Sequence, residues 1–97
     1  MERTLTSLRN SLDGKIYVYC KDAETAQEFI ADAEAEGYHY GKLRPSESPA
    51  DNIIALHDDK QLAHVGAIGR MDFQSGGGHR IDYAKYKNGD TDYYYSK

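Results

Sequence analysis

The chain has 97 residues, a formal net charge of −4, nine tyrosines, no tryptophan and one cysteine. This length fits a single domain over residues 1–97 with a modest core. One cysteine excludes an intramolecular disulfide framework and suits a reducing cytosol, and no apolar run approaches the ~20 residues that a membrane-spanning helix needs. We therefore expect a cytoplasmic protein with no membrane segment.

The charge is unevenly distributed along the chain. Residues 13–36 contain seven acids against two lysines, whereas residues 60–89 contain five bases against two acids. General nucleic-acid binding needs a broad basic footprint, so we do not expect it. The two halves should instead prefer different partners.

The first predicted elements are an N-terminal helix or ordered arm within residues 1–13 and a strand over residues 15–21. Leu5, Leu8 and Leu12 have helical spacing. In the strand, Ile16, Val18 and Cys20 alternate with Tyr17 and Tyr19, so both faces are apolar and a central place in the sheet is expected. Cys20 should be a buried, inert thiol.

A helix is predicted from Ala23 to Glu36, with Asp22 as its N-cap and Gly37 as its left-handed stop. One side carries an apolar stripe of helical spacing, Ala26, Phe29, Ile30 and Ala33. Acids recur every fourth residue on another side: Glu24, Glu28, Asp32 and Glu36. This acidic stripe is either a solvated face or a surface that imitates phosphates for a basic partner.

The second half of the chain is predicted to be mainly strands. The expected segments are a long connection (37–50), a strand (51–57), a turn (58–60), a long amphipathic strand (62–74), a loop (75–78) and a returning strand (79–87). Gly66 and Gly69 inside the long strand suggest a bulge or a close backbone approach.

Asn88-Gly89 predicts a closing hairpin, because this pair suits a two-residue turn with positive φ. That turn would place Lys87 opposite Asp90 and Lys85 opposite Asp92, two opposite-charge pairs, and Tyr83 opposite Tyr94. The competing interpretation is a short helix from Tyr83 to Asn88 that Gly89 ends. With the hairpin, the fold class is α+β: one main helix on a mostly antiparallel sheet of about five strands, in the order (α)-β-α-β-β-β-β.

The glycine loop is the candidate binding site. Successive backbone N–H groups can hold a phosphate where glycine removes steric barriers, and nearby cations and a tyrosine ring could complete the site. The expected ligand-binding residues are His64, Arg70, Gly76, Gly77, Gly78, His79, Arg80 and Tyr83. The loop lacks the spacing of a known phosphate motif, so a plain connection is the open alternative.

Nothing in the sequence indicates an enzyme, a cofactor or a metal site. Nucleophilic hydrolysis by Cys20 would need a neighbouring base, whereas Cys20 alternates with Ile16 and Val18 on an expected core face. The four histidines share no ligand spacing, and a zinc ion held by His57 and His64, which flank a turn, is the one metal alternative.

Two segments, residues 15–38 and 57–69, resemble small proteins of phages and other mobile elements of Gram-positive bacteria. The resemblance covers about half the chain and implies a counter-defence context. We therefore expect a non-enzymatic homo-oligomer that sequesters a phosphorylated small molecule, a nucleotide immune signal. The alternatives are an acidic inhibitor of a host defence nuclease, such as a CRISPR effector, acting through the acidic stripe, and a structural or regulatory phage protein without a small ligand.

Overall fold

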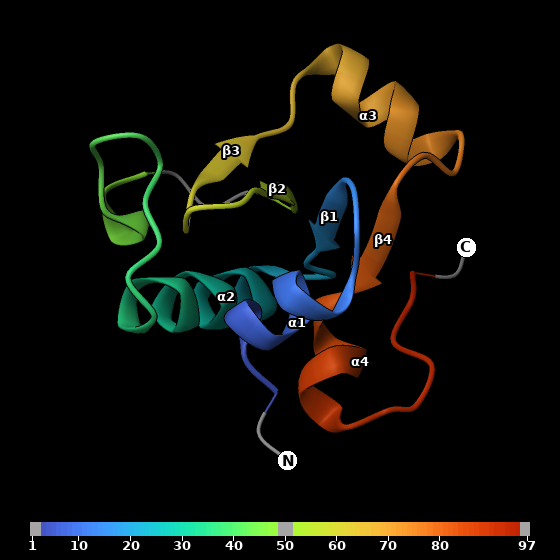
Figure 1. Cartoon of the computed structure of the whole chain (residues 1–97), viewed down its shortest axis with the longest axis horizontal. Helices are drawn as coiled ribbons and strands as arrows, with labels where there is room; N and C mark the ends of the chain where they lie inside the picture. Colours follow the sequence, from blue (N-terminus) through green and yellow to red (C-terminus); the bar gives the residue numbers. More distant parts are fainter. Residues whose placement is uncertain (1–2, 49–51, 96–97) are drawn as a thin grey trace.

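The computed structural model describes residues 3–48 and 52–95 (Figure 1). Helices and strands alternate along much of the chain. In chain order they are α1 (Leu5–Ser11), β1 (Ile16–Tyr19), α2 (Ala23–Ala35), the 3-10 turn η1 (Pro45–Glu47), β2 (Ile53–Leu56), β3 (Leu62–His64), α3 (Ala67–Gln74), β4 (His79–Asp82) and α4 (Tyr83–Asn88).

The strands form one four-stranded sheet in the order β3-β2-β1-β4. β1 pairs antiparallel with β2 and parallel with β4, and β2 pairs antiparallel with β3. The α+β class is confirmed, with four strands in place of about five, and β1 has the predicted interior position. Among the described residues, no helix is long and apolar enough to cross a membrane.

The two faces of the sheet are covered differently (Figure 1). Helices α1, α2 and α4 pack on one face, where Ile16, Val18 and Cys20 join the larger core cluster. Helix α3 lies on the other face, where Tyr17 joins a smaller cluster with Ile53, Val65 and Phe73. The predicted alternation of β1 and the buried thiol of Cys20 are therefore confirmed.

Local signals place the N-terminal helices as predicted. Helix α1 lies within residues 1–13, with Leu5 and Leu8 buried. The Asp22 side chain accepts a hydrogen bond from the Thr25 N–H at 2.8 Å, and Gly37, at φ +84°, ends α2. The Tyr38 N–H then donates to the Ala33 carbonyl at 2.9 Å, which satisfies a carbonyl at the helix end.

The predicted strand over residues 62–74 is wrong beyond His64, because residues 67–74 form α3. Val65, Gly69 and Phe73 are four residues apart and face the sheet, as a helix requires. The predicted strand would place Met71 on its apolar face and Ile68 on the opposite face. In the helix both side chains are exposed, Ile68 at 86% and Met71 at 66%. Gly66 begins the helix instead of forming a bulge, whereas Gly69 does mark a close approach: a Cβ there would lie 2.7 Å from Val65 Cγ1.

The predicted hairpin at Asn88-Gly89 is also wrong, and the helical alternative is the observed structure. Tyr83 and Tyr86 are both buried on α4, and Gly89, at φ +90°, ends the helix. Lys87 Nζ lies 3.5 Å from Asp32 Oδ2, not opposite Asp90. Burial of two tyrosines against the core outweighs the cross-strand charge pairs, and the chain after α4 returns so that Tyr94 pairs with Ile81, not with Tyr83.

Candidate functional site

A pocket of about 490 Å³ opens on the sheet face that α3 covers only in part. Its floor contains Tyr17, Ala55 and Ala63, from three adjacent strands. These residues are direct neighbours, since Tyr17 pairs with Ala55 and Ala55 with Ala63. Two methyl side chains beside a tyrosine ring leave space above the sheet that larger residues would fill.

The tyrosine of the floor is fixed by the helix beside it. Tyr17 Oη donates to Asp72 Oδ2 of α3 at 2.7 Å, and its ring meets Phe73 edge to face at 6.1 Å between centroids. Burial, followed by the Asp72 carboxylate, raises the pKa of the Tyr17 phenol. Tyr17 is therefore an uncharged residue of the pocket floor, and its contacts with Asp72 and Phe73 hold α3 in place.

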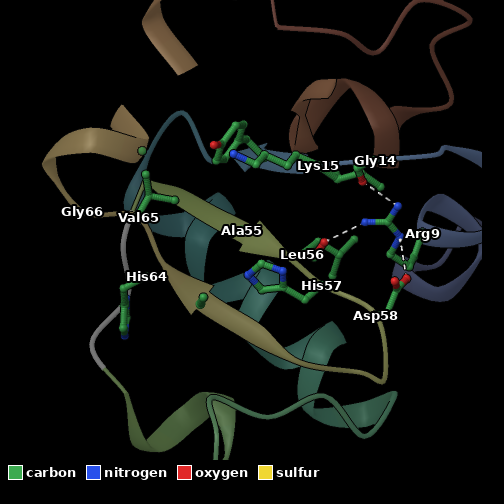
Figure 2. A pocket seen from close by; sticks show the side chains of 14 residues that line it. Arg9, Gly14, Lys15, Ala55, Leu56, His57, Asp58, His64, Val65 and Gly66 are labelled. Atoms are coloured by element: carbon green, nitrogen blue, oxygen red, sulfur yellow. Dashed lines mark hydrogen bonds and ion pairs between the residues drawn. The ribbon is translucent and has the colours of Figure 1, made fainter. Parts of the chain in front are cut away.

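Lys15 brings positive charge to the pocket, and His57 brings ring nitrogens that can hydrogen-bond to a ligand. Lys15 directly precedes β1 and His57 directly follows β2, each two residues from the Tyr17–Ala55 pair, so they extend its face of the sheet. Figure 2 shows them on opposite sides of the pocket with Ala55 between them. Within residues 3–48 and 52–95, neither side chain has a hydrogen-bond or ion-pair partner.

Arg9 lines one end of the pocket but has a structural task (Figure 2). Its guanidinium donates to the carbonyls of Leu56 at 3.0 Å, Leu12 at 2.9 Å and Gly14 at 2.8 Å, and its Nε lies 3.5 Å from Asp58 Oδ1. These bonds tie α1 to the end of β2. Arg9 adds charge to the pocket from a fixed position.

The predicted phosphate loop uses its N–H groups internally. The Gly76 N–H donates to the Phe73 carbonyl at 3.2 Å and the Gly77 N–H to the Asp72 carbonyl at 2.8 Å, with Gly76 at φ +88°. These are the bonds that close a helix C-terminus. A Cβ on Gly77 would overlap the Asp72 carboxylate, and one on Gly78 would lie 3.0 Å from the Lys15 carbonyl. The glycines thus end α3 and let it approach β1, and a carboxylate occupies the side where an anion was expected.

The cations after the loop are engaged in packing. His79 Nδ1 lies 2.7 Å from Tyr94 Oη, and its Nε2 lies 2.8 Å from the Asp13 carbonyl. Arg80 donates to the Phe73 carbonyl at 3.2 Å and lies over the rings of Phe73 and Tyr95 at 5.6 and 5.7 Å. Both side chains hold neighbouring segments on β4.

The remaining predicted ligand residues do not converge. Tyr83 is buried on the opposite face, where its hydroxyl donates to Asp32 and its ring meets Phe29. Burial, then the hydrogen bond to Asp32, raises the pKa of Tyr83 strongly. Arg70, on α3, donates to Asn52 Oδ1 at 3.2 Å. Among the predicted ligand residues, only His64 belongs to the pocket lining.

The backbone of His64 lies at the pocket, but its side chain lies on the other face. The ring stacks on Tyr40 at 4.5 Å between centroids and its Nε2 lies 2.7 Å from Ser48 Oγ. His57 shares the Ala55 side, so His57 and His64 do not meet at a zinc ion. In the part of the chain that the structure describes, no group of three or more His, Cys, Asp or Glu residues is arranged to hold a metal.

The acidic stripe is divided by the fold. Glu36 accepts from the N–H groups of Leu5 and Thr6, each at 2.9 Å, and so caps α1. Asp32 binds Tyr83 and lies near Lys87. Glu24 and Glu28 are the two members of the stripe left exposed.

Sequence reasoning missed Lys15 as a site residue and considered His57 only as a zinc ligand. A usable signal was present. Lys15 comes just before β1, two residues from Tyr17, and His57 comes just after β2, two residues from Ala55, so alternation places each of them on the face of a floor residue. Recognising the site required the strand register, because only the register places these residues side by side.

Comparison of the chain with protein-family models, with curated proteins and with solved structures found no match.

Proposed function

We propose that this protein is a non-enzymatic binding protein that holds a small phosphorylated molecule of nucleotide size in the pocket beside α3. The observation that supports this proposal is the placement of Lys15 and His57 in one pocket lining, at the end of the β1–β2 pair and beside a floor that includes Ala55 and Ala63. Small-molecule sites are typically clefts of ~300–1,000 Å³, mostly apolar, with a few polar groups that fix orientation. A pocket of about 490 Å³ falls in this range.

Charge favours an anionic ligand over a neutral or cationic one. Lys15, His57 and Arg9 line the pocket, and Asp58 is its one acidic lining residue. Asp58 lies beside Arg9, so Lys15 and His57 stay available to phosphate oxygens. Attraction between opposite charges is stronger in a partly desolvated site than in bulk water.

The glycine loop supports the proposal less well than the pocket does. Its N–H groups at Gly76 and Gly77 already have acceptors, and Asp72 would repel a phosphate there. The acidic stripe is also weaker than predicted as a surface for a basic partner, because only Glu24 and Glu28 of its four residues are exposed. We therefore prefer a small anion in the pocket to the acidic inhibitor.

The resemblance to small phage proteins suggests which molecule is bound and why. The bound molecule would be a nucleotide signal of a host defence pathway, which the protein would sequester in the cytoplasm as a homo-oligomer. Native mass spectrometry of protein purified from cells would test both parts, because it reports the number of chains and any retained nucleotide.

Isothermal titration with AMP, ADP-ribose, cyclic mononucleotides and cyclic dinucleotides tests the binding itself. At least one of these should bind, and Lys15→Met should weaken that binding by about tenfold or more, as expected for a lost charge-assisted contact. Lys42→Met is the matched control, since Lys42 is exposed and outside the pocket lining. The proposal is refuted if none of the nucleotides binds, or if the two lysine variants behave alike.

A further inference from the structure

The pocket changes character along its length. Figure 2 shows Arg9 at one end, Lys15 and His57 on its two sides, and Val65 and Gly66 at the other end. Apart from His64, whose ring lies on the opposite face of the sheet, the lining at the α3 end is uncharged: Ala63, Val65, Gly66 and Gly69. A ligand that fills this pocket therefore meets cations with one part and apolar, small residues with the other.

The uncharged end has room because three elements contribute small side chains. Ala55 and Ala63 form a paired methyl floor across β2 and β3, and Gly66 and Gly69 line the pocket at the start of α3 and within it. A flat ring can lie on such a floor of methyl groups. Dispersion contacts between the ring and the floor favour this stacking.

Gly66 is the glycine whose identity the fold does not require. Its backbone, at φ −80° and ψ −171°, is open to any residue, and a Cβ there would meet nothing within 4 Å. Gly69 differs, because close packing on Val65 accounts for it. Open space at Gly66, beside the pocket, is where a larger side chain would compete with a ligand.

We infer that the ligand is a nucleotide bound in one orientation, with its phosphate between Lys15 and His57 and its base at the uncharged end beside Gly66. This orientation rests on the proposed function. It makes Gly66 a specificity-determining position, since a bulky residue there would exclude the base while leaving the phosphate position open. ADP and inorganic pyrophosphate share the phosphate chemistry and differ in the base, so together they separate the two ends.

Titration of the full chain with ADP and with pyrophosphate tests this orientation. Gly66→Phe should weaken ADP binding at least tenfold and leave pyrophosphate binding within about twofold. Ile68→Phe is the matched control and should keep binding of both probes, because Ile68 is exposed on α3 and outside the pocket lining. Lys15→Met should weaken both probes.

Amide spectra of the ¹⁵N-labelled protein give a second readout that also detects millimolar binding. ADP should shift the signals of Gly66 and Gly69, whereas pyrophosphate should shift those near Lys15 and His57 alone. Equal weakening of both probes by Gly66→Phe, or ADP shifts that spare Gly66 and Gly69, would overturn the orientation. A wild-type protein that binds neither probe and none of the nucleotides tested above would instead refute the proposed function itself.

Discussion

The two faces of the sheet differ in how completely they are covered. On the face of α1, α2 and α4, side chains such as Leu5, Phe29 and Ile81 have no exposed surface. On the face of α3, the cluster around Tyr17 and Phe73 is smaller and ends at an open pocket. One face therefore supplies most of the hydrophobic stabilisation, and the other keeps space that a ligand can occupy.

Removing one ring from each face should have the largest effect and measures this difference directly. Phe29→Ala should lower the free energy of unfolding by about 4 kcal/mol, because its cavity would be enclosed on all sides. Phe73→Ala should cost about 2 kcal/mol, since the neighbouring rings of Tyr19 and Tyr95 can move into the space. Urea unfolding followed by circular dichroism gives both values.

If Phe29→Ala prevents folding, Phe29→Leu and Phe73→Leu replace the alanine variants, because they keep the same order of losses at a smaller cost. Equal losses for Phe29→Leu and Phe73→Leu would show that the two faces are equally well packed. That result would break the comparison.

Alkaline pH should destabilise the covered face next. Burial, followed by the nearby Tyr93, raises the pKa of Tyr86 to about 12, whereas a phenol in the unfolded chain ionises near pH 10. Between pH 10 and 12 the unfolded chain therefore loses a proton that the folded protein keeps, and the free energy of unfolding falls as pH rises. This stability is complete below pH 10.

Urea midpoints measured across that interval, with absorbance of the phenolate, check this effect. Tyr86→Phe should flatten the fall, because the substituted ring has no proton to lose. A midpoint that stays constant above pH 10, or a slope that Tyr86→Phe leaves unchanged, would contradict it.

Two of the three helices on the covered face were predictable from sequence, whereas α4 was expected as part of a hairpin. Local signals mark the two: Asp22 before α2, Gly37 after it, and leucines at helical spacing in α1. The interior place of β1 follows from its two apolar faces. Each of these features depends on residues that are neighbours in the chain.

The open face was less predictable because its residues meet only through the register. Alternation over residues 62–74 matched a strand, but Val65, Gly69 and Phe73 also match a helix, and glycines carry no side chain to decide between them. Consecutive glycines predict N–H groups that can bind an anion. The path of α3 shows instead that the N–H groups of Gly76 and Gly77 close the end of a helix. Lys15 and His57 are 42 positions apart in the sequence, and pairing of β1 with β2 alone brings them together.

Loss of a single hydroxyl on the open face should have a smaller effect. Tyr17→Phe removes the bond to Asp72 at 2.7 Å and should lower the free energy of unfolding by about 1 kcal/mol. Tyr19→Phe is the matched control, since no hydrogen bond of its hydroxyl is found among the described residues. Equal values for the two variants would mean that the Tyr17–Asp72 bond does not hold α3 on the sheet.

The smallest effect should come from the outer side of α3. Ile68 is 86% exposed, and isoleucine and serine have similar helix propensities, so Ile68→Ser should change the free energy of unfolding by less than about 0.5 kcal/mol. Val65→Ala, in the segment just before α3, should cost about 1.5 kcal/mol, because two buried methyl groups are lost. Thermal unfolding of the two variants compares the exposed side of α3 with a buried side chain that directly precedes the helix. If Ile68→Ser costs as much as Val65→Ala, another surface must cover the outer side of α3 in solution. The face of the sheet under α3 would then be more fully covered than in the single chain.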